Sequence, residues 1–259
     1  MQILTVTLFQ SDLAWEDVDT NIAAFDEKIS RLAGRRDLII LPEMFPTGFS
    51  MNADSLAETM EGPAVKWLID IAHRYQVNIT GSMIITENNR YFNRLIWARP
   101  DGELLTYDKR HLFRYAGEHK TYTAGSRQMT ISLNGWKIRP FICYDLRFPA
   151  WTRNSNNGYD LAIFIANWPQ TRADHWKTLL TARAIENQSV VIGVNRVGTD
   201  GNGLKYSGDS SVIDPTGRVL FQSAFQELEH TIRLSYADLR SYRKSFPALM
   251  DADRFQVEI

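Results

Sequence analysis

The sequence predicts a mixed α/β fold in which two β-sheets pack face to face and helices cover their outer sides. Three observations support this prediction. Apolar runs rich in β-branched residues recur along the chain, amphipathic helical segments follow several of them, and tight-turn signals join others directly. Two packed sheets accommodate the roughly one dozen strands that result, although the strand order stays open.

The N-terminal part of the chain predicts a strand, a helix and a second strand. Residues 3–9 are rich in β-branched residues and predict the first strand. A helix capped by Asp19 or Thr20 follows, because apolar residues recur at helical spacing: Ile22, Ala23, Phe25, Ile29 and Leu32. Residues 38–41 are continuously apolar, as in a strand buried on both faces. Glu43 therefore stands just beyond the C-terminal end of this strand.

The next stretch combines a helix with antiparallel strands. Gly62-Pro63 predicts a helix start, because proline is favoured in the first turn. Strands predicted over residues 78–86, 91–98 and 103–107 are joined by short turns, which is typical of antiparallel neighbours. Lys109 lies just beyond the last of these strands.

A hairpin lies near the middle of the chain. Asn134-Gly135 is a strong turn signal between the predicted strands at residues 129–133 and 136–142. Cys143 follows the second of these strands immediately.

Further strands complete the predicted sheets. Residues 161–166 are continuously apolar and residues 190–197 are mainly apolar, and both segments predict buried strands. Between them, residues 171–174 have the spacing of a capping box, with Asp in place of the usual Glu, and predict the start of a helix. Residues 214–217 form a predicted turn between two more strands.

Length, charge and cysteine content limit the class of protein. Residues 1–259 are expected to form one domain, with no repeat or linker. The 29 basic and 30 acidic residues give a net charge of -1, so nothing points to nucleic acid or to a membrane surface. A single cysteine, no secretory signal and no long apolar stretch predict a soluble, cytoplasmic protein.

Cys143 is the first candidate for chemistry. A lone cysteine beside an apolar run is usually a small buried hydrophobe. Here, however, Cys143 lies at the junction between an apolar strand and a polar stretch. A side chain at such a junction projects out of the sheet, as in nucleophile elbows. A helical turn after Cys143 would aim backbone N–H groups at the sulfur, so a lowered thiol pKa is expected.

Glu43 and Lys109 are weaker candidates when taken alone. Glu43 is either a solvated strand end or a base that takes the thiol proton and returns it to a departing amine. Lys109 is either a surface lysine or a fixed positive charge that stabilises a tetrahedral intermediate. Spacing does not bring these residues together, but their strands could end at one pocket.

Three local motifs resemble those of the nitrilase superfamily, and the resemblance covers nearly the whole chain. They are Leu41-Pro42-Glu43-Met44-Phe45, Tyr107-Asp108-Lys109-Arg110-His111-Leu112-Phe113 and Cys143-Tyr144-Asp145-Leu146-Arg147-Phe148-Pro149. The resemblance implies a four-layer αββα sandwich and a Glu-Lys-Cys triad formed by Glu43, Lys109 and Cys143. Glu118 matches a further family glutamate that orients the lysine and the substrate amide.

The resemblance also implies a mechanism without metal or cofactor. Cys143 attacks an amide carbon, while Lys109 and the backbone N–H of Tyr144 hold the oxyanion. Ammonia leaves with a proton from Glu43, and a water activated by Glu43 releases the acid from the thioester.

Within the superfamily, the motif at residues 143–149 and the segment Asn167-Trp168-Pro169 look most like the ω-amidase branch. Those enzymes hydrolyse the terminal amide of α-ketoglutaramate and α-ketosuccinamate. Such a substrate carries a carboxylate, so the pocket should present a cation. The candidates are Arg147, Arg114 and Arg172. Each could instead form a structural ion pair, and Asp145 is the expected partner of Arg147.

Several alternatives remain open at the level of sequence. The protein could be another nitrilase-family amidase, acting on a short aliphatic amide or an N-carbamoyl compound; a nitrile is less expected. A non-catalytic binding module or a redox sensor using Cys143 are more distant alternatives. Trp168 is either a pocket wall or a packed aromatic.

The histidines do not predict a metal site, and the family resemblance implies an assembly of two subunits. His111, His119 and His175 do not have the spacing of a metal site. The family resemblance implies a homodimer, in which about the last 15 residues, from Phe246-Pro247 onward, contact the partner subunit. A tail folded on its own subunit is the alternative.

Overall fold

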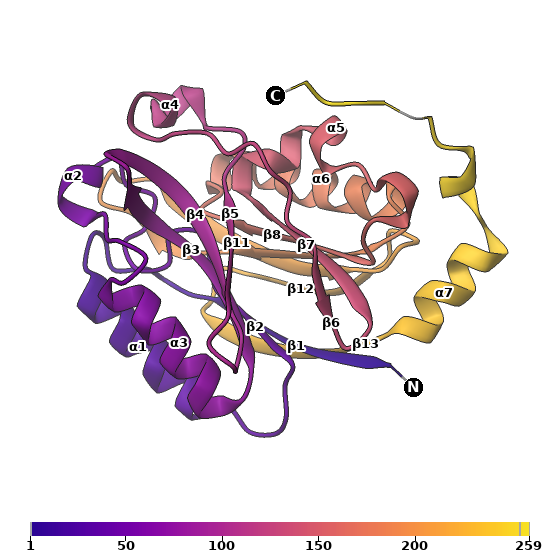
Figure 1. Ribbon diagram of the computed structural model, residues 1–259, viewed down its shortest axis with the longest axis horizontal. Helices are drawn as coiled ribbons and strands as arrows, with labels where there is room; N and C mark the ends of the chain where they lie inside the picture. Colours follow the sequence, from indigo (N-terminus) through magenta and orange to yellow (C-terminus); the bar gives the residue numbers. More distant parts are fainter. Residues whose placement is uncertain (1, 254, 259) are drawn as a thin grey trace.

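A computed structural model describes residues 2–253 and 255–258, and it contains two mixed β-sheets packed face to face. Helices α1 (Val18–Ser30) and α3 (Pro63–Tyr75) cover one outer face, and α5 (Pro149–Thr152) and α6 (Ala173–Glu186) cover the other (Figure 1). The predicted αββα sandwich is therefore confirmed. Within the described residues, no helix has the length and hydropathy to span a membrane.

The first sheet has the strand order β13-β1-β2-β3-β4-β5. Its strands are β1 Ile3–Gln10, β2 Leu38–Ile40, β3 Asn78–Glu87, β4 Arg90–Ala98, β5 Leu104–Asp108 and β13 Leu228–Ser235. Strands β1, β2 and β3 run parallel, whereas β3, β4 and β5 form an antiparallel meander, as predicted. Glu43 and Lys109 follow strands of this sheet.

The second sheet has the order β10-β11-β9-β8-β7-β6, with β12 paired to β11. Its strands are β6 Ile131–Leu133, β7 Trp136–Ile142, β8 Leu161–Ala166, β9 Val190–Asn195, β10 Val197–Thr199, β11 Lys205–Ile213 and β12 Val219–Ala224. Strands β7, β8 and β9 run parallel. Every residue of β8 and β9 is buried, which explains why these two strands are mainly apolar. Cys143 follows a strand of this sheet.

The main core lies between the two sheets. Leu4, Val6 and Leu8 alternate along β1 and face this core, whereas Phe9 points to the opposite side, under α1 and α3. Trp136 and its neighbours on the second sheet meet the first sheet from the other side. The sheets are thus fixed against each other by a continuous buried apolar layer.

Short helices complete the chain and shape the loops at the strand ends. They are α2 Ala53–Leu56, α4 Glu118–Thr121, α7 Tyr236–Ser245, and the 3₁₀ turns η1 Arg114–Ala116, η2 Cys143–Arg147, η3 Ser155–Asn157, η4 Gln170–Arg172 and η5 Ala248–Asp251.

Two predicted helix caps were wrong. Helix α1 is capped by Asp17 rather than by Asp19 or Thr20: the Asp17 carboxylate accepts the backbone N–H of Thr20 at 3.0 Å and its hydroxyl at 2.8 Å. Helix α6 begins at Ala173, within the predicted segment, but it has no side-chain cap, because Thr171 and Arg172 belong to the 3₁₀ turn η4.

The C-terminal segment lies against its own subunit. The side chain of Gln188 donates a hydrogen bond to the carbonyl of Phe246 at 2.7 Å and accepts one from the N–H of Leu249 at 3.3 Å. Phe255 and Val257 line a small cavity together with Ala150 and Trp151 of α5. Arg254 and Ile259, which belong to the predicted dimer-contact tail, lie outside the described residues. Contact with a partner subunit stays a prediction.

Candidate active site

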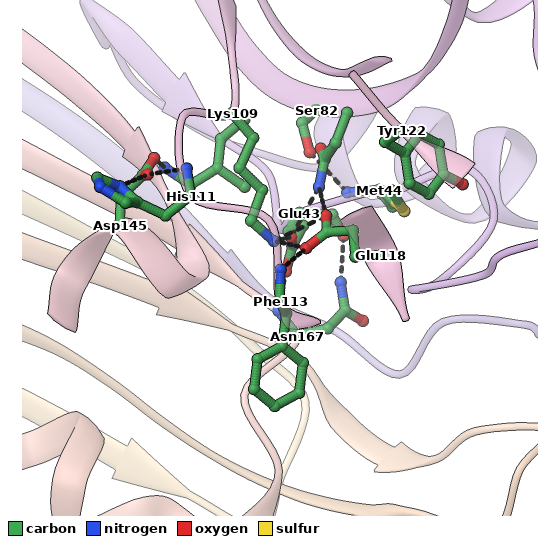
Figure 2. Close-up of polar contacts among 12 residues, drawn as sticks. Glu43, Met44, Ser82, Lys109, His111, Phe113, Glu118, Tyr122, Asp145 and Asn167 are labelled. Carbon is green, nitrogen blue, oxygen red and sulfur yellow. Dashed lines mark hydrogen bonds and ion pairs between the residues drawn. The ribbon is translucent and has the colours of Figure 1, made fainter. Parts of the chain in front are cut away.

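Strand ends of both sheets converge on one buried cluster of polar side chains. Glu43 follows β2, Lys109 follows β5, Glu118 opens α4, and Cys143 follows β7. Figure 2 shows Glu43, Lys109 and Glu118 turned toward one another, together with Asn167 from the loop after β8. The structure thus brings together residues that are far apart in the sequence.

Glu43 is the most heavily contacted member of this cluster. Its carboxylate accepts hydrogen bonds from the ammonium of Lys109 at 2.8 Å, from the side chain of Asn93 at 2.8 Å and from the backbone N–H of Asn167 at 2.8 Å. The residue is fully buried. These three donors fix the carboxylate in one orientation, and the donors come from both sheets.

Lys109 is fully buried between two carboxylates. Its Nζ lies 2.8 Å from Oε1 of Glu43 and 3.0 Å from Oε1 of Glu118. Burial alone would lower the pKa of Lys109, but the charges of Glu118 and Glu43 outweigh it and hold the pKa above its ordinary value. The side chain is therefore a fixed cation, and its ammonium also lies 5.1 Å from the ring centre of Phe49.

Glu118 completes a group of two carboxylates around one ammonium. Its carboxylate also accepts the backbone N–H of Phe113 at 2.5 Å. Burial raises the pKa of Glu118 above its ordinary value, and the charge of Glu43 acts in the same direction. Because two acids face one cation in a buried site, an additional negative charge there is disfavoured.

Cys143 sits at a sharp bend between β7 and the 3₁₀ turn η2. Its φ of +44° lies in the left-handed region, which is uncommon for a side chain other than glycine and agrees with the predicted elbow. The expected lowering of the thiol pKa was wrong. Burial raises the pKa of Cys143 well above its usual value, and the charge of Glu43 adds to this more than Lys109 offsets it.

Asp145 ties the Cys143 bend to the Lys109 loop. Its buried carboxylate accepts hydrogen bonds from the hydroxyl of Tyr107, the backbone N–H of Ile142, and both the backbone N–H and the ring of His111. Figure 2 shows Asp145 beside His111. The expected ion pair between Asp145 and Arg147 is not formed, because these four donors already surround the carboxylate.

A pocket of about 770 Å³ opens above Cys143, and Lys109, Asn167 and Tyr144 line it as well. Other lining residues come from different parts of the chain. The arginine wall consists of Arg147, Arg172, Trp168 and Phe113, and a second set of lining residues, the Asp200 group, consists of Trp15, Asn52, Asp200 and Tyr206.

Aromatic faces hold both cations of the arginine wall. The guanidinium of Arg147 lies 4.7 Å from the ring centre of Trp168 and 3.0 Å from Nδ1 of His175. That of Arg172 lies 5.4 Å from the ring centre of Phe113. Burial lowers the pKa of Arg147, and the nearby charge of Arg172 contributes to the same direction. Two cations therefore face one cavity, whereas Arg114 is exposed and does not line it.

Hydrogen bonds and close packing hold the Asp200 group in place. Asp200 accepts hydrogen bonds from the hydroxyl of Tyr206 and from the backbone N–H groups of Asn202 and Leu204. A Cβ at Gly201 would stand 2.3 Å from the ring of Trp15, so only glycine permits this contact.

Two asparagines of the site were missed at the level of sequence. Asn93 lies within strand β4, and Asn167 follows β8; both are buried and both donate to Glu43. A buried polar residue inside an apolar run was the available signal. Among the described residues, no group of three His, Cys, Asp or Glu side chains has the arrangement of a metal site.

A family model for carbon–nitrogen hydrolases matches residues 5–246. The chain belongs to the carbon–nitrogen hydrolase family. The predicted resemblance is thereby confirmed, as is the prediction of a hydrolase that acts on carbon–nitrogen bonds.

Relatives of this carbon–nitrogen hydrolase match it along almost its whole length. The omega-amidase YafV of Escherichia coli (strain K12) is 46% identical over 255 residues, which cover 98% of each chain. The 2-oxoglutaramate amidase of Bacillus subtilis (strain 168) is 34% identical over 251 residues, covering 95% of this chain and 96% of the relative. A CN-hydrolase superfamily protein from Xanthomonas campestris, whose crystal structure has an arsenic adduct in the active site, superposes with a TM-score of 0.97 at 46% identity over 100% of both chains.

Proposed function

We propose that this carbon–nitrogen hydrolase is an ω-amidase, which hydrolyses the terminal amide of α-keto acid monoamides such as α-ketoglutaramate and α-ketosuccinamate. The names of the Escherichia coli and Bacillus subtilis relatives support this substrate class. The observation that carries the proposal is a pocket with a thiol at its floor and two guanidinium groups on one wall.

In the first half of the reaction, the amide acylates Cys143. Glu43 takes the thiol proton, and the sulfur attacks the amide carbon to form a tetrahedral intermediate. Lys109 and the backbone N–H of Tyr144 hold the oxyanion. The C–N bond then breaks, the nitrogen takes the proton from Glu43, and ammonia leaves behind a thioester.

In the second half, water releases the acid. Glu43, again a carboxylate, takes a proton from water as the water oxygen attacks the thioester carbon. The C–S bond breaks, and the proton on Glu43 returns to the sulfur. Lys109 keeps its proton throughout, because the two adjacent carboxylates favour its charged form. Glu118 holds Lys109 in place rather than exchanging protons.

Arg147 and Arg172 bind the carboxylate at the far end of the substrate. Guanidinium groups form paired, charge-assisted hydrogen bonds with carboxylates, and both groups lie on the pocket wall beside Cys143. Trp168 supports Arg147 from behind and forms part of the same wall. The substrate is thus held at its acid end while its amide reaches the thiol.

A comparison of two amides tests the substrate class. We expect α-ketoglutaramate to exceed butyramide in kcat/KM, because only the former carries a carboxylate. Arg147→Ala and Arg172→Ala should each raise KM for α-ketoglutaramate about tenfold and leave butyramide unaffected. Arg114→Ala is the matched control, since Arg114 lies outside the pocket. A preference for butyramide, or for a larger amide, would favour another amidase of the family.

The nucleophile is tested by one substitution. Cys143→Ala should abolish ammonia release while the thermal unfolding temperature stays within a few degrees of the wild-type value. Substantial residual turnover would remove Cys143 from the scheme.

We further propose that residues 1–259 form one domain and that the protein is cytoplasmic, in line with its single cysteine. The resemblance to nitrilases implies a homodimer, which we also propose. Light scattering after size-exclusion chromatography should give twice the mass of the 259-residue chain. Removal of the residues from Phe246 onward should weaken the dimer if this tail contacts the partner. Cell fractionation should recover the activity with the cytoplasmic fraction.

A further inference from the structure

Asn167 is attached to the proposed base at two points. Its backbone N–H donates to Oε2 of Glu43 at 2.8 Å, and its side-chain Nδ2 donates to the backbone carbonyl of Glu43 at 2.5 Å. Since a carbonyl oxygen only accepts, the amide nitrogen must face Glu43. Figure 2 shows this nitrogen directed to Glu43 and the Oδ1 atom turned away. The orientation of the side-chain amide is therefore fixed.

The remaining atom, Oδ1 of Asn167, is buried and has no hydrogen-bond partner among the described residues. An unpaired buried acceptor is costly, and native proteins keep few of them. Asn167 also lines the pocket together with Cys143 and Lys109. A buried acceptor beside the nucleophile and the base is thus free to bind a donor that enters with the ligand.

We propose that Oδ1 of Asn167 accepts an N–H of the substrate carboxamide and so makes Asn167 a further catalytic residue. This inference rests on the proposed amide hydrolysis. The carboxamide nitrogen has two N–H donors, whereas a nitrile, an ester or a ketone has none at this position. Asn167 therefore selects amides over nitriles, esters and ketones.

The same hydrogen bond orients the nitrogen for its departure. When the tetrahedral intermediate forms, the nitrogen becomes pyramidal and its lone pair must point at the proton held by Glu43. Asn167 is bonded to Glu43 at two atoms, so the acceptor for the N–H and the acid that protonates the nitrogen move as one unit. The C–N bond then breaks as the proton is transferred.

A binding experiment separates this role from turnover. The Cys143→Ala protein is titrated with α-ketoglutaramate and with 2,5-dioxohexanoate, a methyl ketone in which CH₃ replaces the NH₂ of the amide. We expect the amide to bind about tenfold or more tightly than the ketone. In the Cys143→Ala/Asn167→Ala protein this preference should disappear. Comparing the ratio of the two dissociation constants between variants cancels differences between the free ligands.

Asn93 provides a matched control. Like Asn167, it donates from its side chain to Glu43 and has an unpaired buried Oδ1, but it does not line the pocket. Cys143→Ala/Asn93→Ala should therefore change both dissociation constants together and keep their ratio. If Asn93→Ala reduced the ratio of the two dissociation constants as much as Asn167→Ala does, only the position of Glu43 would matter. That result would overturn the inference.

A second variant covers the case in which Asn167→Ala does not fold. Asn167→Asp presents an acceptor oxygen in either protonation state, so the amide preference should persist. Equal binding of amide and ketone to Cys143→Ala, or a preference that survives Asn167→Ala, contradicts the inference while leaving the proposed function intact. Failure of the wild-type protein to release ammonia from any amide contradicts the proposed function itself.

Discussion

The buried carboxylate of Asp145 binds His111 twice, through the backbone N–H at 2.9 Å and through ring Nδ1 at 2.8 Å. Asp145 lies two residues after Cys143, and His111 lies two residues after Lys109. This contact fixes the bend that carries the thiol relative to the loop that carries the ammonium. The distance between the proposed nucleophile and its oxyanion partner is thus set by a residue outside the triad.

Asp145→Asn should destabilise the protein and impair the site. Four donors converge on this carboxylate, and an amide would turn an NH₂ group toward at least one of them. We expect a loss of about 2–4 kcal/mol in the free energy of unfolding, measured by urea denaturation. His111→Phe, which keeps the backbone bond and the stack on Phe148, should cost only about 1 kcal/mol. Equal costs for both variants would contradict this assignment.

Cys143 should react slowly with alkylating agents near neutral pH. Its pKa is raised by burial and by Glu43, so the thiol stays protonated at pH 7 and becomes a thiolate only as the pH rises through that higher value. The measurement is the rate of iodoacetamide labelling between pH 6 and 10. The urea-unfolded chain should label faster at pH 7. Faster labelling of the folded protein would show that the thiolate is preformed.

Lys109→Ala should lower kcat far more than it weakens substrate binding. In the proposed mechanism the ammonium stabilises charge that develops only in the transition state, and loss of such a group costs about 10²–10³-fold in kcat. Steady-state kinetics with α-ketoglutaramate, combined with its dissociation constant in a Cys143→Ala background, separates the two effects. A pure binding defect would assign Lys109 to substrate recognition instead.

Glu58 should make stability depend on pH. Its carboxylate accepts the N–H of Ala64 at 2.9 Å at the start of α3, yet burial raises its pKa to about 7 from the ordinary 4.5. The folded state therefore holds this proton more tightly than the unfolded state, and stability falls as the pH rises from 4.5 to 7. Between these two pH values, the free energy of unfolding should decrease by about 1–2 kcal/mol less in Glu58→Gln than in the wild type, allowing for solvent screening. The exposed Glu61→Gln is the control, and an identical effect there would reject the assignment.

A continuous apolar run predicted the strand end before Glu43, and turn signals predicted the strand ends before Lys109 and Cys143. A strand that is buried on both faces is apolar at successive positions, so its burial can be predicted from the sequence. The cap of α1 was misplaced because Asp17, Asp19 and Thr20 are all able to cap, and only the geometry of the preceding loop selects among them.

The electrostatics of the site could not be predicted in the same way. The local motif of Cys143 suggested a lowered pKa, because a turn of helix follows it in the chain. The dominant influences, burial and the carboxylate of Glu43, come from packing between the two sheets. Asp145 was assigned the wrong partner for the same reason: sequence proximity favoured Arg147, whereas Tyr107 and His111 approach through space.

The link between Glu43 and Asn167 joins one half of the polypeptide to the other. Residues up to about 110 supply the acid and the ammonium, and residues from about 140 onward supply the sulfur and the asparagine. Neither half, expressed separately, would hold a complete reaction centre. Turnover therefore requires the two sheets to stay packed against each other. Partial unfolding that separates the sheets would abolish activity before the strands within each sheet unfold.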